Sequence, residues 1–494
     1  MTNEPKHSEP ETKEPKPSLL DAIVPLLALI ILLGLSYYLF GNSASSGPNQ
    51  VALLFCGIIA AGIAYKNGMP WEGIRQSVVS GIAIGLPAMM ILLAVGALIG
   101  AWSLSGTISS MVYYGLLLLS PDYFYATTAL VCAIVAFSIG SSWTVAGTIG
   151  VGLMGIAASM NLSPAITAGA IISGAYFGDK ASPLSDTVNL ATATAGSQIY
   201  DHIRESLWTS IPSLVISIGL FAYLGSEGDF DATPLLQGIK SKVTVSPWAF
   251  LPLVIVFVLS MIRFPAFVTI FIGALAGACL AILQDPERVV AFAAAAELPL
   301  PLGLLKGAWA ALATGYVANT GLASIDQILT RGGMASMMST IWLILAALSF
   351  GAVVEHAGLL NRLIEPLIAK VKSTAALVAT TIATAIGVNA MAADQYIAIA
   401  LPSRLFAPVF AKRTIEPVVL SRVIGDSATV TSPLIPWNSC GAYMAITLGV
   451  PTTLYAAFCF FNILNPIMTI LFTILGLRVL KSVPAGQPVV GQLG

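Results

Sequence analysis

The sequence predicts an all-α polytopic membrane protein with two inverted-topology repeats, each containing a helical hairpin and a broken transmembrane helix. Three observations support this fold class. The 494-residue chain is 57% apolar and only 9% charged, with a mean hydropathy of +0.88, whereas a soluble domain carries about 25% charged residues. Apolar segments long enough to cross a bilayer follow one another along the chain. Finally, two polar runs with Gly and Pro, 178–186 and 425–434, interrupt such segments in corresponding parts of the two halves.

Composition also excludes several classes of partner. A net charge of -1 and a pI near 6.3 argue against nucleic acid or another polyanion. The three His and five Cys are scattered, with no CxxC spacing, so neither a transition-metal site nor a disulfide framework is expected. No cofactor is predicted, and the main surroundings of the chain should be the lipid bilayer.

The order of segments divides the chain into six parts. The first residues, rich in Glu, Lys and Pro, cannot bury apolar surface. The apolar run 19–40 is longer than the roughly 7–15 residues of a signal-peptide core, so we expect an uncleaved first helix. The predicted parts are a disordered cytoplasmic tail (1–18), N-terminal transmembrane helices (19–76), inverted repeat 1 (77–225), a connecting transmembrane region with loops (226–335), inverted repeat 2 (336–480) and a cytoplasmic tail (481–494).

Within these parts, uninterrupted apolar runs predict single spans, and interrupted runs predict hairpins and broken helices. Single spans are expected at 19–40, 50–65, 77–102, 207–225, 247–262, 264–283, 336–354 and 452–478. Hairpins are expected at 121–160 and 373–411, and broken helices at 163–196 and 415–447. The stretch 300–321 is apolar but contains Pro and Gly, and we predict a re-entrant or interfacial piece there.

Charge distribution predicts that the two repeats are inverted. The connection 105–122 contains no Lys or Arg, whereas its counterpart 357–374 carries Arg362, Lys370 and Lys372. Since cytoplasmic loops are enriched in Lys and Arg, the two halves should have opposite orientations, with both chain termini in the cytoplasm. A paired helix break in two such halves is the best sequence indication of a secondary transporter's binding site.

The ionisable residues inside the apolar segments are the strongest candidates for a site. Burying a charge there costs roughly 2.5–3.5 kcal/mol on insertion scales, so such residues are usually functional. Asp179 and Asp426 lie in the paired breaks, Asp394 lies at a hairpin tip, and hydroxyl and amide side chains surround them. These oxygen ligands suit an alkali cation, and a carboxylate that binds either a cation or a proton can exchange one for the other. The predicted cation- and proton-binding residues are Asp179, Ser182, Ser185, Asp186, Asn189, Asp394, Asp426, Thr429, Thr431, Ser432 and Asn438.

Neighbours of this predicted site come mainly from the hairpin tips; they are Ser141, Ser142, Trp143, Lys180 and Asn389. Each feature also has a purely structural interpretation. A single Ser-Pro-Leu in an apolar helix is usually a kink, but two copies with acids beside them favour a site. Lys180 is as easily explained as a charge-neutralising partner as by a transport role.

These runs resemble the NhaC family of Na+/H+ antiporters, within the wider ion transporter superfamily. The matching residues are Phe177 to Leu190, Asp394-Gln395-Tyr396 and Asp426 to Ala442. The family usually carries an acidic residue where this chain has Gly425. The resemblance implies a two-repeat fold in the bacterial cytoplasmic membrane, often a homodimer with elevator-like motion. It also implies exchange of Na+ for H+, with Na+ at the cation-binding residues above and alternating access at the broken helices.

Other functions stay open at this point. The same family includes exchangers of organic acids such as malate and lactate, which would need a positive group at the cavity. Lys180 is the intramembrane candidate, so Lys180→Met should abolish anion exchange and spare Na+/H+ exchange. An intramembrane aspartyl protease would use the two Asp residues as paired carboxylates, but the sequence around Asp179 does not match such proteases. A channel is a weaker alternative, because no filter-like run is visible.

Overall fold

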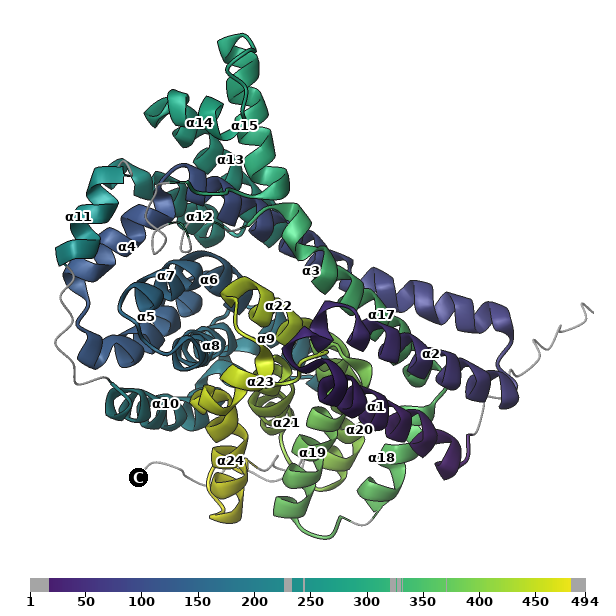
Figure 1. The fold of residues 1–494 in the computed structure, drawn as a ribbon. Helices are drawn as coiled ribbons and strands as arrows, with labels where there is room; N and C mark the ends of the chain where they lie inside the picture. The colour runs from purple at the N-terminus through teal and green to yellow at the C-terminus, as the bar shows by residue number, and fades with distance from the viewer. Residues whose placement is uncertain are drawn as a thin grey trace, which may run out of the picture.

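The computed structural model describes residues 17–225, 233–242, 245–319, 326, 330, 332–369 and 371–480. Every regular element in these residues is a helix, which confirms the all-α prediction (Figure 1). Nine of the described helices are long and apolar enough to cross a membrane, or ten if one bent pair counts as a span. The predicted C-terminal tail and residues 1–16 of the predicted N-terminal tail lie outside the described residues.

The N-terminal helices form a bundle with a helix from the second half. Helix α17 packs against α2 and α3, and α1 packs against α2 (Figure 1). Helix α3 is one continuous element of 34 residues, so it crosses the boundary expected between 76 and 77. The bundle consists of α1 (Leu19–Phe40), η1 (Gly41–Ser46), α2 (Pro48–Lys66), α3 (Trp71–Leu104), η5 (Met334–Met337) and α17 (Met338–His356).

The first half continues with a short helix, a hairpin, a broken helix and a long helix. The hairpin turns at Gly140, and its second arm contains a π-helical turn, η3. Helix α8 packs along α5, so the hairpin and the broken helix form one unit. The elements are α4 (Thr107–Leu118), η2 (Pro121–Tyr123), α5 (Phe124–Ile139), α6 (Ser142–Val145), η3 (Ala146–Gly150), α7 (Val151–Ser159), α8 (Pro164–Ala181), α9 (Asp186–Ala195) and α10 (Ile199–Tyr223).

The second half has its elements in the same order, as the sequence predicts. The opposite orientation of the two halves in the membrane stays a prediction. The elements are α18 (Leu359–Ala369), α19 (Thr374–Ala392), α20 (Gln395–Lys412), α21 (Pro417–Ile424), η6 (Gly425–Thr429, a π-helical turn), η7 (Ser432–Leu434), α22 (Ser439–Leu448), α23 (Thr452–Tyr455), η8 (Ala456–Phe458) and α24 (Phe460–Ile474).

The last of these segments differs from its prediction. The sequence predicts one span over 452–478, but the chain bends by 53° between Phe458 and Phe460. Two contacts explain the bend. First, the Phe458 backbone lies very close to Gly169: a Cβ added to Gly169 would lie 2.5 Å from the Phe458 carbonyl oxygen. Second, the Asn462 side-chain amide donates to the Val430 carbonyl at 2.7 Å. The bend therefore positions α24 beside both broken helices.

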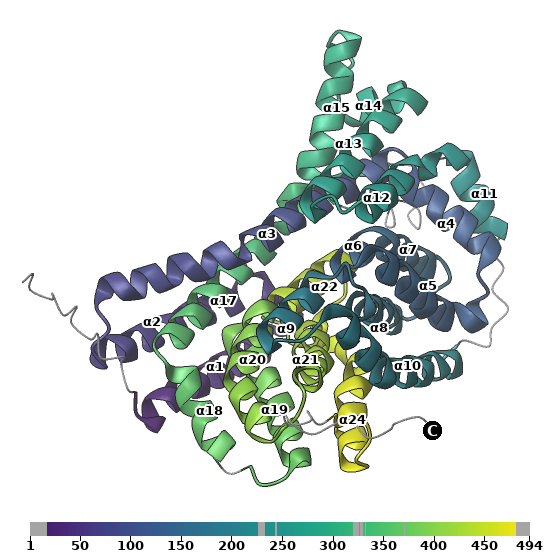
Figure 2. The same cartoon turned by 180° about the vertical axis from the view of Figure 1, so that it is seen from behind.

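The connecting region extends away from this body. Helices α13, α14 and α15 project together beyond one end of α3 (Figures 1 and 2). Helix α15 has 15 residues, fewer than the roughly 20 needed to cross a bilayer; the re-entrant or interfacial placement of 300–321 stays a prediction. The elements here are α11 (Thr233–Lys242), η4 (Pro247–Phe250), α12 (Leu251–Met261), α13 (Ala266–Gln284), α14 (Pro286–Phe292) and α15 (Leu300–Thr314).

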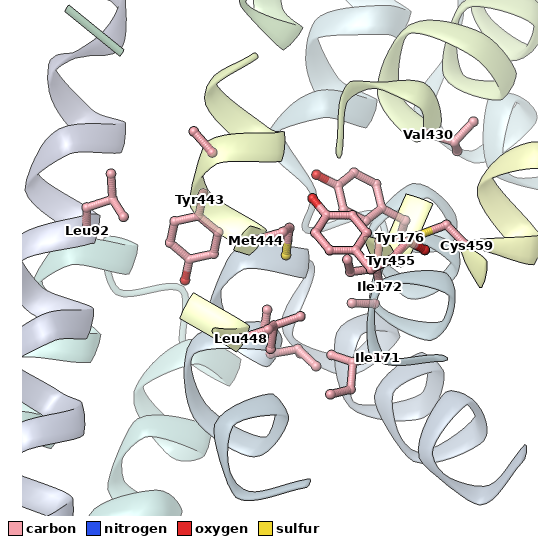
Figure 3. Packing of buried hydrophobic residues seen from close by; sticks show 14 of the residues in the cluster. Leu92, Ile171, Ile172, Tyr176, Val430, Tyr443, Met444, Leu448, Tyr455 and Cys459 are labelled. Carbon is pink, nitrogen blue, oxygen red and sulfur yellow. Dashed lines mark hydrogen bonds between the residues drawn. The ribbon is translucent and has the colours of Figure 1, made fainter. Parts of the chain in front are cut away.

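The two broken helices lie at the centre of the molecule, between the hairpin α5–α7 and the hairpin α19–α20 (Figures 1 and 2). A buried cluster that includes Tyr176, Tyr443 and Tyr455 packs around them (Figure 3). The Tyr455 hydroxyl donates to the Pro433 carbonyl at 2.8 Å, which satisfies a backbone acceptor that the break in the second helix leaves without a helical partner.

Candidate functional site

The first helix break arises from local sequence. Helix α8 ends at Ala181 because Pro183 disfavours helical geometry at the residue before it, and Ser182 is extended, with φ -90° and ψ 133°. Helix α9 then begins at Asp186, where the Ser185 hydroxyl caps it by accepting from the Val188 backbone N–H at 3.4 Å. The break leaves Asp179 near the end of α8 and turns the Ser185 hydroxyl toward it.

The Asp179 carboxylate joins the hairpin tip to this break. Its Oδ2 accepts from the Ser142 backbone N–H at 3.2 Å and from the Ser142 hydroxyl at 2.7 Å. Its Oδ1 accepts from the Ser185 hydroxyl at 2.5 Å. The tip can approach so closely because Gly140 is left-handed at φ 77°, and a Cβ there would lie 2.6 Å from the Leu184 Cβ.

Asp179 is 4% exposed, and it belongs to none of the ion pairs found among the described residues. It lies in the wall of a cavity of about 700 Å³. A buried charge without a counter-ion is costly, so the site favours a bound cation or a proton. Besides Asp179, the cavity is lined by residues that include Ser141, Ser142, Trp143, Thr144, Asp186, Thr187, Asn189, Tyr200, Arg263, Gln395, Tyr396, Ser439 and Cys440.

Asp426 has quite different surroundings. It lies in the π-helical turn η6 and is completely buried. Lys180 forms an ion pair with its Oδ1, and Thr469 donates to its Oδ2 at 2.5 Å. Thr209 donates to both oxygens, at 3.2 and 3.0 Å, and the Arg422 Nε lies 4.0 Å from Oδ2.

Asp179 and Asp426 therefore share no hydrogen-bond partner among the described residues. Because successive residues point about 100° apart around a helix, the adjacent Asp179 and Lys180 can face different sides of α8. Asp179 faces the cavity and Lys180 faces Asp426. A paired-carboxylate arrangement, as a protease would need, is absent from these contacts.

The third predicted acid, Asp394, caps a helix. Its Oδ1 accepts from the backbone N–H groups of Tyr396 and Ile397, at 2.8 and 3.1 Å. Its Oδ2 accepts from the Ser439 hydroxyl at 3.4 Å. The carboxylate thus holds the tip of the second hairpin against the start of α22, and it is absent from the cavity lining.

Polar side chains of the second break bind one another or the backbone. The Asn389 amide donates to the Ala428 carbonyl at 2.7 Å and to the Thr431 hydroxyl at 3.1 Å. Asn438 donates to the Asn389 backbone and side-chain oxygens, at 3.1 and 3.2 Å. The Ser432 hydroxyl lies 2.8 Å from both the Gln395 side-chain oxygen and the Thr429 carbonyl. Together these bonds position the irregular backbone of the break, and Thr429 lies buried beside them.

The remaining predicted residues, except Ser182, line the cavity. Asp186 accepts from the Tyr396 hydroxyl, a contact that joins α9 to the second hairpin. Asn189 donates to the Ser185 carbonyl at 2.6 Å. The Trp143 ring stacks on Tyr443, with ring centroids 4.0 Å apart. Two hydroxyls accept hydrogen bonds from the backbone. The Ser141 hydroxyl caps α6 by accepting from the Thr144 N–H at 3.2 Å, and the Ser182 hydroxyl accepts from the Leu184 N–H at 3.2 Å.

Sequence reasoning did not select several residues that the structure places at these sites. Asn465 and Thr469 contact Lys180 and Asp426 from α24. The sequence did carry a signal for them, because polar residues at 462, 465 and 469 recur on one face of an otherwise apolar helix. Thr209 carried no such signal, because its role depends on how α10 packs. Arg422 did carry one, as a basic residue within the predicted broken helix 415–447, but it was not selected.

Comparison with known proteins shows the family of the chain. The Na+/H+ antiporter family model matches residues 174–477, and the C4-dicarboxylate anaerobic carrier model matches residues 2–222. The chain is 38% identical over 437 residues to the Na(+)/H(+) antiporter NhaC of Alkalihalophilus pseudofirmus, covering 87% of this chain and 91% of the relative.

Two further relatives are antiporters of other substrates. The chain is 32% identical over 496 residues to the arginine/ornithine antiporter ArcD of Halobacterium salinarum, covering 98% of each chain. It is 31% identical over 449 residues to the malate-2H(+)/Na(+)-lactate antiporter of Bacillus subtilis, covering 90% of this chain and 91% of the relative. With its match to the family model, its identity to NhaC and its series of apolar helices, the chain is a multi-pass membrane protein that belongs to the Na+/H+ antiporter family.

Proposed function

We propose that this protein exchanges Na+ for H+ across the bacterial cytoplasmic membrane, with Asp179 as the carboxylate that binds each ion in turn. One observation carries the proposal. Asp179 is a nearly buried carboxylate in the wall of a large cavity, bonded by hydroxyls and a backbone N–H, and without an ion-pair partner in the described part of the chain. Such a group can be neutralised by Na+ or by a proton.

The hydroxyls of Ser142 and Ser185 suit this alternation. A hydroxyl can donate to a bare carboxylate, and after rotation it can present an oxygen lone pair to a cation. Carboxylate and hydroxyl oxygens are hard ligands of the kind that alkali and alkaline-earth cations take. Na+ at Asp179 would therefore have oxygens from the hairpin tip and from the helix break. Because one carboxylate cannot hold Na+ and a proton together, binding of one expels the other, and this competition couples the two fluxes.

Alternating access would follow from movement of the hairpins and broken helices as a unit. Access to Asp179 is through a cavity that Tyr200 and Arg263 also line. Arg263 is a basic residue between α12 and α13, and the enrichment of Lys and Arg in cytoplasmic connections would place it on the cytoplasmic side, so this conformation would be open to the cytoplasm. We also propose that both termini are cytoplasmic and that the protein is a homodimer, as the resemblance to NhaC implies.

The other predicted residues have supporting roles in this proposal. Asp186 and Asn189 lie in the cavity wall and would attract cations toward Asp179. Asp394, Asn389, Thr429, Thr431, Ser432 and Asn438 would shape the second hairpin tip and break. The carboxylate of Asp426 would be a second cation position, in contact with Lys180 rather than with the cavity.

Exchange of organic acids is the second candidate, because Arg263 places a positive group in the cavity lining and one relative is a malate/lactate antiporter. Lys180, the residue first suggested for this task, is absent from the lining and bonds to Asp426. An organic acid would therefore depend on Arg263. Arg263→Gln should abolish uptake of radiolabelled malate or lactate if either is a substrate, and should leave Na+-dependent proton flux in place.

The test of Na+/H+ exchange is Na+-driven proton flux in proteoliposomes. We expect Asp179→Asn to abolish the flux, and Asp122→Asn, which changes an exposed loop carboxylate in the same way, to preserve it. Asp426→Asn should also lose flux, because Lys180 would be left buried without its counter-ion. Folded protein that shows no Na+-dependent flux, or full flux in Asp179→Asn, would refute the proposal.

A further inference from the structure

The ammonium group of Lys180 is buried and surrounded by oxygen atoms. Its Nζ donates to the Ser210 hydroxyl at 2.7 Å and to the Asn465 side-chain oxygen at 2.9 Å, and it forms an ion pair with Asp426. An ammonium has three N–H donors and no acceptor, so these oxygens satisfy it completely. Lys180 is 1% exposed, and its three partners are 0% exposed.

Contacts that do not involve Lys180 keep these oxygen atoms in place. Asp426 receives hydrogen bonds from Thr209 and Thr469, and the side-chain amide of Asn465 donates to the Ser213 hydroxyl at 3.5 Å. The partners of Lys180 come from α10, η6 and α24, whereas Lys180 itself comes from α8. Removing the lysine side chain would therefore leave the oxygens largely in position.

We infer that Asp426, Ser210 and Asn465 form a second monovalent-cation site, and that Lys180 occupies it as a tethered ammonium. Carboxylate, amide and hydroxyl oxygens around one point are the ligand chemistry of a hard cation. The group that these oxygens hold is a primary ammonium, so a small alkylammonium ion, with the same charge and the same three N–H donors, is the matching free ligand.

This inference deepens the proposed function and rests on it in one respect. With a tethered cation on Asp426, that carboxylate has a permanent counter-ion, so Asp179 is the one that exchanges ions. The neighbouring Arg422 does not replace Lys180 at this position. Its Nε is 4.0 Å from Asp426, and its NH1 is directed to Glu205 at 3.4 Å and to the Arg478 carbonyl at 3.0 Å.

The test is to vacate the site in the full-length protein and offer a free cation. We expect purified Lys180→Ala to bind radiolabelled methylammonium in equilibrium dialysis and to show a thermal midpoint that rises with methylammonium concentration. Both effects should vanish in Lys180→Ala/Asp426→Asn and persist in Lys180→Ala/Asp179→Asn. The control Lys66→Ala, which removes a lysine that is paired with Asp21 but 68% exposed, should show neither effect.

Lys180→Ala is purified with and without methylammonium, so that a folding defect also tests the cation site. Recovery of monodisperse protein only with the amine supports the site, provided that Lys180→Ala/Asp426→Asn is recovered equally well under both conditions. A Lys180→Ala protein that neither binds methylammonium nor is rescued by it overturns the inference, as does binding that survives Asp426→Asn. Retained flux in Asp179→Asn would instead refute the proposed exchange and leave the cation site standing.

Discussion

The hydroxyls of Ser142 and Ser185 allow a sharp test of Na+ binding at Asp179. Removing each hydroxyl by Ser142→Ala or Ser185→Ala should weaken Na+ binding, by different amounts. Ser185 provides the only hydrogen bond to Oδ1 among the described residues. Ser142→Ala removes the 2.7 Å hydroxyl contact to Oδ2 but keeps the backbone N–H at 3.2 Å. We therefore expect Ser185→Ala to have the larger effect.

The magnitude follows from the charge of the carboxylate. A hydrogen bond to a charged group contributes about 1.5–3 kcal/mol, and each 1.36 kcal/mol is a tenfold change in affinity. Ser185→Ala removes this hydrogen bond from the Na+-free state and an oxygen ligand from the Na+-bound state, so only the difference between the two contributions appears in the Kd. If the oxygen ligand contributes about 1.4 kcal/mol more than the hydrogen bond, Ser185→Ala weakens Na+ binding about tenfold, with about 150-fold as an upper limit.

The assay is a Na+ titration by isothermal calorimetry at constant pH. Ser185 also caps α9, so its loss could act through helix stability. Ser163→Ala is the matched control, because Ser163 caps α8 with the same 3.4 Å contact to a backbone N–H and does not contact Asp179. We expect Ser163→Ala to bind Na+ like the unmodified protein. Unchanged Na+ affinity in Ser185→Ala would refute Ser185 as a Na+ ligand, and unchanged Na+ affinity in Asp179→Asn would refute the assignment of Asp179.

Three further results are expected. Gly140→Ala should abolish Na+-dependent flux and lower the thermal midpoint, because a left-handed Cβ costs about 1–2 kcal/mol and would lie 2.6 Å from Leu184; normal flux would contradict this. Lys180→Met should destabilise the protein by about 3–5 kcal/mol, because Asp426 then keeps only the Arg422 Nε, at 4.0 Å, as a counter-charge. The double variant Lys180→Met/Asp426→Asn should recover most of that loss in thermal unfolding; a double variant as unstable as the single one would argue against it. Finally, raising the pH should lower the apparent KM for Na+ in flux assays, because fewer protons compete for Asp179; a KM independent of pH would exclude a shared carboxylate.

The helices were largely predictable because their signal is local. The span predicted at 19–40 is α1, Leu19–Phe40, and both predicted hairpins and both predicted breaks occur as expected. Length and hydropathy determine such elements in a bilayer. The bend between Phe458 and Phe460 was missed because it depends on contacts with Gly169 and Val430, which lie far away in the sequence.

In the candidate site, too, local sequence predicted some features and long-range packing determined the others. The choice of Asp179, Asp394 and Asp426 needed only their occurrence as acids within apolar segments. Their different surroundings could not be derived in this way. Asp394 caps α20, Asp426 binds Lys180, and Asp179 faces the cavity. A sequence shows that a charge is buried, whereas the partner that compensates the charge is set by packing.

Sequence alone therefore determined that the chain is an all-α membrane protein and that its two interrupted helices carry acidic residues, because hydropathy and helix-breaking residues act over a few turns. The sequence placed Asp179 and Asp426 in the breaks themselves, whereas the structure has them in α8 and in the turn η6, just before the breaks. Only the tertiary structure decided that Ser142 of the hairpin tip bonds Asp179, while Lys180, the next residue along α8, turns to Asp426. The physical reason is that adjacent residues on a helix face different neighbours, and those neighbours come from elements up to 285 residues away.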